Sequence, residues 1–132
     1  MTLAEALGPD VDLVRRHVPS VDPARVRLAA LPDWCRRLAG IDPLAVTLGR
    51  LVLVSPEVHR LPRCARVGLL AHEAAHVAQT SSSPLGFGVA YGVAYLVGRL
   101  AGRSHHAAYR NVPAEVLARE VQRRVLAECR GG

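Results

Sequence analysis

The sequence predicts a small α+β domain, and three observations carry that prediction. Residues 68–79 (G-L-L-A-H-E-A-A-H-V-A-Q) are rich in alanine and lack proline, which favours a helix. Residues 44–54 are mainly Leu and β-branched residues around a central Gly49-Arg50, which is typical of a β-hairpin. Residues 85–100 and 113–129 add two helical segments. We therefore expect a small hairpin or sheet packed on the first helix, with two further helices beside it.

The length of the chain predicts a single domain covering residues 1–132. Half of the residues are hydrophobic, but only one Trp, three Tyr and one Phe are aromatic. The core must therefore be built mainly from Leu, Val and Ala.

The N-terminal third predicts short elements. Residues 2–7 are expected to form one helical turn and residues 11–18 a short helix, because Gly8-Pro9 and Pro19 interrupt the helical pattern. Neither segment carries residues that suggest chemistry.

Residues 21–31 are ambiguous. Asp22-Pro23 resembles a helix start, whereas residues 25–28 alternate polar and apolar side chains as an edge strand does, and we favour the strand. Residues 32–38 then predict a short helix that ends near Gly40 and places Trp34 in the core.

In the predicted hairpin, residues 51–54 are expected to be the strand nearest the helix at 68–79. An edge strand beside that helix is a natural place for an extended peptide to pair by strand addition. The hairpin thus predicts a sheet edge close to the histidines.

The second half of the chain begins with an apolar segment at 85–100, which contains four glycines and Arg99. It is shorter than the about 20 apolar residues that a membrane span requires, so we expect a buried or partly exposed helix and no membrane partner. The polar loop that follows carries His105 and His106, and Pro113 is expected to begin the last helix. The apolar stripe of that helix is predicted to be Val116, Leu117, Val121, Val125 and Leu126.

The charge of the chain is +6, and all 17 basic residues are arginines. A basic chain ordinarily suggests nucleic acid or an anionic surface as a partner. Here the arginines are scattered as singles and pairs, and the few aromatic residues form no stacking platform. We therefore expect no nucleic-acid binding.

Cys35, Cys64 and Cys129 are odd in number and widely spaced, so buried free thiols are expected rather than a disulfide framework. The first residues include acids where a signal peptide has a basic region. We expect a cytoplasmic protein, although delivery by a dedicated secretion machine leaves no such mark in the sequence.

The helix at 68–79 contains the pattern H-E-x-x-H. On a helix, residues four apart share a face, so His72 and His76 can direct two imidazoles at one zinc ion. Glu73 lies beside the pair, where its carboxylate can take a proton from water activated by the metal. The pattern predicts a zinc hydrolase; the alternative is a buried polar cluster whose groups are satisfied without metal.

A third protein ligand is needed, because catalytic zinc is usually held by three side chains plus water. The pattern H-E-x-x-H-x-x-G-x-x-H fails, since position 79 is Gln and position 82 is Ser. Glu115, at the start of the last helix, is the favoured third ligand, with His105 or His106 as rivals.

Four segments in this order resemble a bacterial family of uncharacterised zinc metallopeptidases that occurs with contractile injection systems and in toxin-like proteins. They are residues 47–54 (T-L-G-R-L-V-L-V), 70–79 (L-A-H-E-A-A-H-V-A-Q), the glycine-interrupted helix with Leu and Tyr at 85–100, and 108–118 (A-Y-R-N-V-P-A-E-V-L-A), and the similarity spans roughly residues 45–120. The resemblance implies a minimal zincin-like α+β fold of the gluzincin type. By that resemblance His72, His76 and Glu115 hold zinc and Glu73 is the catalytic base.

One position departs from the gluzincin pattern. Many gluzincins have an acid four residues after the third ligand, where it hydrogen-bonds a ligating histidine, but this chain has Arg119. Metal affinity or turnover is expected to be lower unless Glu120 or Asp42 takes that role.

Two functional hypotheses follow. The leading one is a zinc-dependent peptidase in which Glu73 activates water and Tyr109, His105 or His106 stabilises the oxyanion. The alternative is a non-catalytic zincin-like module that docks a protein partner through the apolar helix at 85–100.

Overall fold

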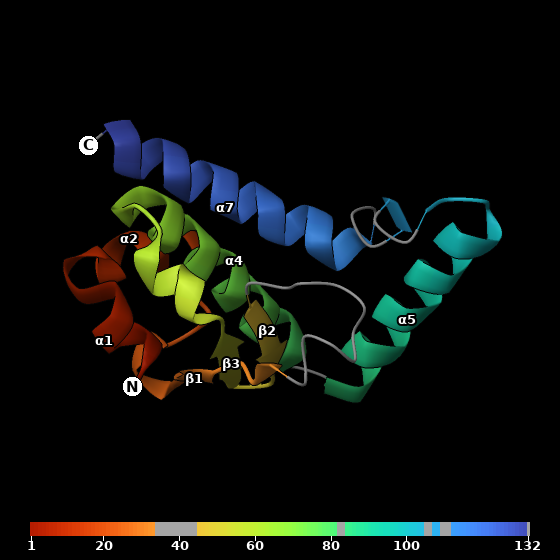
Figure 1. Ribbon diagram of the computed structural model, residues 1–132, viewed down its shortest axis with the longest axis horizontal. Helices are drawn as coiled ribbons and strands as arrows, with labels where there is room; N and C mark the ends of the chain where they lie inside the picture. Colours follow the sequence, from red (N-terminus) through yellow and green to blue (C-terminus); the bar gives the residue numbers. More distant parts are fainter. Residues whose placement is uncertain (34–44, 82–83, 105–106, 109–111, 132) are drawn as a thin grey trace.

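The computed structural model describes residues 1–33, 45–81, 84–104, 107–108 and 112–131. Most of the helix expected at 32–38, including Trp34, therefore lies outside the described residues, as do Asp42, His105, His106 and Tyr109. The described elements form the small α+β fold that the sequence predicts (Figure 1).

Three short strands form one mixed sheet, β1 (Arg27–Ala30), β2 (Ala45–Leu48) and β3 (Leu51–Val54), in the order β1-β3-β2. The predicted hairpin is confirmed, because β2 and β3 are antiparallel and Gly49 turns the chain with a φ of 64°. β1 pairs parallel to β3 at the other edge. The 3-10 turn η2 (Pro23–Arg25) precedes β1, so the segment at 21–31 contains both features that its sequence suggested.

Two long helices lie side by side: α4 (Arg63–Ser81), which bears the histidines, and α7 (Pro113–Gly131) (Figure 1). The short α1 (Leu3–Leu7), η1 (Gly8–Asp10) and α2 (Val11–His17) are grouped at one end of this pair. Another 3-10 turn, η3 (Pro56–Arg60), leads from β3 to α4. At the opposite end α5 (Pro84–Leu100) extends away from the sheet and the N-terminal helices.

The core surrounds α4, whose residues 70–77 are all buried, as its apolar sequence predicts. One continuous cluster joins aliphatic side chains of the N-terminal helices, the sheet, α4 and α7. The cluster contains Leu3, Leu7, Val14, Val18, Val21, Val26, Leu28, Val52, Val54, Val58, Val67, Leu70, Ala71, Ala74, Val77 and Val125. Polar groups on α4 consequently need protein partners, because an unpaired polar atom in such a core is costly.

The position of the hairpin differs from the prediction in one respect. β2, rather than β3, makes the closer backbone approach to α4. β3 is the central strand and pairs on both sides, and its Val52 and Val54 enter the core. The edge strand therefore lies beside the helix that carries the histidines.

The predicted apolar stripe of α7 is wrong at its start. Val116 and Leu117 are 47% and 62% exposed, and the buried residues of α7 are instead Glu115, Ala118, Val125 and Cys129. This rotation turns Glu115 toward α4, where its carboxylate meets two histidines. Pairing of polar groups therefore determines the orientation of this turn of the helix, at the expense of two exposed aliphatic side chains.

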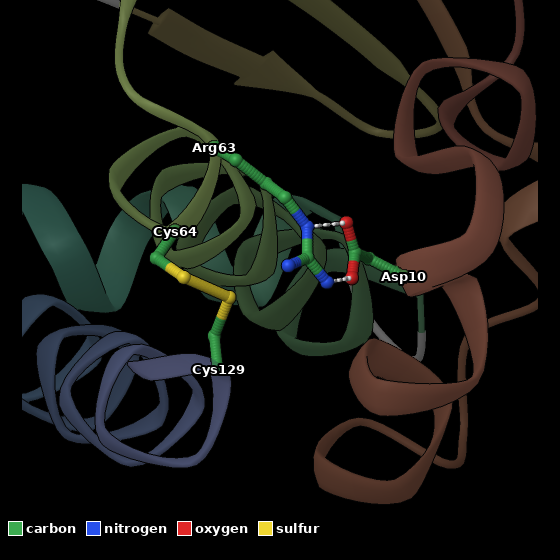
Figure 2. The surroundings of a disulfide bond; sticks show 4 residues. All are labelled: Asp10, Arg63, Cys64 and Cys129. Carbon is green, nitrogen blue, oxygen red and sulfur yellow. Dashed lines mark hydrogen bonds and ion pairs between the residues drawn. A yellow bond between two sulfur atoms is a disulfide. The ribbon is translucent and has the colours of Figure 1, made fainter. Parts of the chain in front are cut away.

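The expectation of free thiols is also wrong, because Cys64 and Cys129 form a disulfide between the start of α4 and the end of α7 (Figure 2). Their Cα atoms are 5.7 Å apart, although 65 positions separate them in the sequence. Beside the disulfide, Arg63 donates two hydrogen bonds to the buried carboxylate of Asp10, the Nε bond being 2.9 Å long. The hydrogen bonds from Arg63 lower the pKa of Asp10 despite its burial.

A second cross-link joins α2 to the same end of α7. Glu128 accepts a hydrogen bond of 2.7 Å from Arg16, and its other oxygen is 2.5 Å from Nε2 of His17. The hydrogen bond from His17 lowers the pKa of Glu128. One end of the α4–α7 pair is thus held by a disulfide and by ion pairs to the N-terminal helices.

The apolar helix α5 is partly exposed, as predicted. Val93, Leu96, Val97 and Leu100 are between 56% and 79% exposed and follow the spacing i, i+3, i+4, i+7, so they lie along one side of the helix. Within the described residues, no helix has both the length and the apolar character needed to cross a membrane.

We predict that breaking the disulfide lowers the stability of the fold without changing its architecture. Cys64→Ala, or reduction with a phosphine, should lower the free energy of unfolding by about 2–4 kcal/mol, because the unfolded chain regains the freedom of a long closed loop. Urea unfolding with and without reductant measures the change. Cys35→Ala is the matched control and should keep the sensitivity to reductant; a wild-type midpoint that does not respond to reductant contradicts the prediction.

Candidate metal centre

The two histidines of α4 lie on one face of the helix and are buried. His72 and His76 are 8% and 7% exposed, and their ring centroids are 4.9 Å apart in an edge-to-face arrangement. Their spacing of four residues produces this stacking along the helix. Both rings direct Nε2 toward the first turn of α7.

Glu115 is the residue of α7 that meets them. Its Oε2 is 3.1 Å from Nε2 of His72, and its Oε1 is 2.9 Å from Nε2 of His76. The carboxylate is 3% exposed, and among the described residues these three side chains are the group whose ligand atoms gather closely, within 4.8 Å of one another. The structure thus brings together the three residues that the sequence suggests as metal ligands.

The electrostatics of the cluster follow from its burial and pairing. Burial acts to raise the pKa of Glu115, but the hydrogen bonds with His72 and His76 outweigh it and lower that pKa well below the usual range. Burial acts to lower the pKa of His76, but the hydrogen bond to Glu115 and its charge raise it, with a further contribution from Glu73. The carboxylate of Glu115 is therefore held in its charged form.

The other ring nitrogen of each histidine faces a glutamine. Nδ1 of His76 is 2.8 Å from Oε1 of Gln79, and Nδ1 of His72 is 2.9 Å from Oε1 of Gln122. The amide nitrogen of Gln79 in turn donates to the carbonyl of Ala114, at 3.1 Å. Both nitrogens of both rings consequently have protein partners.

Glu73 occupies the neighbouring position on α4 and is 5% exposed. Its Oε2 accepts a hydrogen bond of 2.7 Å from the hydroxyl of Thr47 on β2. The close approach of the edge strand to α4 makes this bond possible. Thr47 fixes the carboxylate beside the histidines, and its other oxygen has no protein partner within the described structure.

The acid suggested as a substitute for the missing partner at position 119 does not take that role. Glu120 is directed to the surface, where it binds Arg123 and Arg124, and the hydrogen bond from Arg123 is the first of the causes that lower its pKa to about 2. Gln122, which lies one turn beyond Ala118 on the buried face of α7, contacts His72 instead.

Sequence analysis did not assign roles to Thr47, Gln79 or Gln122. One signal was available, because the chain has two glutamines, one of them three residues after His76 and the other seven after Glu115. Both spacings return to the same face of a helix. Thr47 gave no such signal, since its contact depends on how the sheet packs.

The donor set fits a divalent metal such as zinc. Ligand atoms at about 2.0–2.1 Å from a tetrahedral zinc stand about 3.3 Å apart, and one ligand atom from each of the three residues lies within 4.8 Å of the other two. Two imidazoles and one carboxylate leave a fourth position for water or substrate. Hydrogen-bonded Nδ1 atoms are also typical of histidines that bind metal through Nε2.

Comparisons of the chain with protein-family models, with curated proteins and with solved structures find no match. The resemblance to bacterial zinc metallopeptidases therefore stays a prediction from the segments that carry it, and the site rests on its own geometry.

We predict that the chain binds about one zinc per molecule and that Glu115→Ala reduces this to below about a tenth, because two imidazoles alone do not complete a site. Elemental analysis of dialysed protein measures the ratio. Glu120→Ala is the matched control on the same helix and should retain the metal. Loss of zinc in His106→Ala with retention in Glu115→Ala contradicts the assignment.

Proposed function

We propose that this chain is a zinc-dependent hydrolase and that its substrate is a peptide. The observation that carries the proposal is the position of Glu73, a buried carboxylate held by Thr47 on the same helical turn as two histidines that face Glu115. A structural cluster of histidines has no need for this additional acid, whereas hydrolysis needs a base beside the metal ligands.

His72, His76 and Glu115 are the residues that hold the metal in this proposal. When bound, zinc lowers the pKa of water to about 7 and polarises a carbonyl oxygen. The chain's own contribution is to place Glu73. Because Oε2 of Glu73 accepts a hydrogen bond from the Thr47 hydroxyl, its Oε1 is the atom that takes the proton from water and passes it to the leaving amine.

A peptide is the substrate that the surroundings favour. β2 is an edge strand in the described sheet, and its Thr47 touches Glu73, so an extended chain paired with β2 lies beside the acid. Edge strands bind extended peptides through main-chain hydrogen bonds, which gives affinity without demanding one side chain. This arrangement supports a peptidase over a hydrolase of small esters.

We predict that Glu73→Gln keeps the zinc but lowers peptide cleavage by about 10²- to 10⁴-fold, because the amide cannot take a proton. Mass spectrometry of a diverse peptide library incubated with the zinc-loaded protein measures cleavage. Glu57→Gln is the matched control, since Glu57 lies in η3 and is exposed. If the zinc-loaded wild-type protein cleaves no peptide of the library, the peptidase proposal is contradicted.

One observation favours a second candidate, a binding module. The exposed side of α5 presents Val93, Leu96, Val97 and Leu100, a larger run of apolar side chains than a solvent-facing helix ordinarily carries. A protein partner that covers this side accounts for the exposure.

If α5 docks a protein, a photo-crosslinking residue at position 97 should give a defined adduct in cells. The same residue at exposed Ala127 on α7 should give none. Leu96→Asp should weaken that adduct while leaving zinc content and peptide cleavage unchanged, because α5 lies outside the ligand cluster. Equal adducts at both positions contradict the docking hypothesis.

A further inference from the structure

We propose that Gln79 and Gln122 are positioning residues, which fix the ring nitrogen that each histidine presents to Glu115 and so set how tightly the chain holds a divalent metal. The inference rests on the proposed metal site but not on hydrolysis.

The hydrogen bonds of Gln79 determine which ring nitrogen of His76 carries a hydrogen. The amide nitrogen of Gln79 donates to the carbonyl of Ala114, which leaves Oε1 as the atom that faces Nδ1 of His76, at 2.8 Å. A carbonyl oxygen only accepts, so Nδ1 must carry the hydrogen. When the ring binds a metal it is neutral, and Nε2, the nitrogen that faces Glu115, is then the one whose lone pair the ion takes.

Gln79 also joins two of the three ligands. Ala114 immediately precedes Glu115, so the amide that orients His76 holds the first turn of α7 as well. A displacement of α7 relative to α4 would therefore either stretch the bond from Gln79 to Ala114 or draw the amide away from His76. The amide acts as a spacer between the second ligand and the third.

Gln122 has the corresponding role for His72. Its Oε1 lies 2.9 Å from Nδ1 of His72, and it is seven residues after Glu115, two turns along the same face of α7. One side of α7 thus provides the ligand Glu115 and the support for the opposite side of the His72 ring. Both glutamines of the chain are used in this way.

Because the amides of Gln79 and Gln122 are neutral, they add no negative charge to the buried site. A divalent cation at the cluster is balanced by two buried carboxylates, Glu115 and Glu73. Acids in place of the glutamines would orient the rings equally well, but they would add negative charge to a buried site. Carboxylate partners also make a ligating imidazole more basic and bind metal more tightly. The two amides therefore orient the histidine rings and give the site a moderate affinity for a divalent metal.

The test is zinc affinity, measured by competition with a chromophoric chelator, together with the histidine tautomers read from ¹⁵N ring signals of the zinc-loaded protein. We expect Nδ1–H on both rings in the wild type. Gln79→Met and Gln122→Met should each weaken zinc binding about 10- to 100-fold and give the affected ring a mixture of tautomers. Gln122→Glu keeps an acceptor for His72 and should bind zinc about 10-fold more tightly.

Thr80→Val is the matched control. The hydroxyl of Thr80 donates to the carbonyl groups of His76 and Val77 in the same turn of α4 but touches neither ring, so its loss should change neither affinity nor tautomers. Wild-type affinity and tautomers in both Met variants overturn the inference, as does weaker zinc binding in Gln122→Glu. Wild-type affinity in Glu115→Ala instead overturns the metal site itself, which keeps the two failures distinct.

Discussion

Two imidazoles and two carboxylates are buried together in an aliphatic core, and the need to give each of these groups a polar partner constrains much of the surrounding structure. His72 and His76 are paired through both ring nitrogens, and Glu73 is paired through Thr47. An unpaired polar group in such a core costs about 1–3 kcal/mol, and an unpaired charge costs more. Gln79 on α4 itself partners one nitrogen of His76, and the other partners come from α7 and β2, which lie where they can provide them.

The orientation of α7 shows how this requirement competes with hydrophobic burial. Turning Val116 and Leu117 into the core would remove more apolar surface from water than burying Ala118 does. It would also withdraw Glu115 and Gln122 from two buried histidines. The helix keeps the polar contacts at its start, and it regains apolar packing farther along through Val125 and the disulfide of Cys129.

Local patterns predicted the main helices and strands of the described residues, while contacts between distant segments were predicted only where chemistry required them. The H-E-x-x-H helix, the hairpin at Gly49 and the last helix follow from periodicity and turn residues. The meeting of Glu115 with the histidines could be inferred, because the hypothesis of a metal site calls for a third ligand. The disulfide could not, since spacing does not reveal which thiols meet across 65 positions. The bond from Thr47 depends on which hairpin strand lies nearest α4, and hydropathy does not distinguish two similar strands.

The contacts that stabilise the α4–α7 pair and the residues of the candidate metal site lie toward opposite ends of the two helices. The disulfide, the Asp10–Arg63 pair and the Glu128 contacts hold one end of the helix pair, whereas the histidines and Glu115 meet toward the other. Covalent closure at the first end fixes the register of the helices, but across several helical turns it cannot set distances to a few tenths of an ångström. That adjustment is made locally by Gln79, which ties His76 to the residue before Glu115. Because the disulfide holds one end of the helix pair, the neutral amide of Gln79 has only to adjust the positions of His76 and Glu115 at the other end.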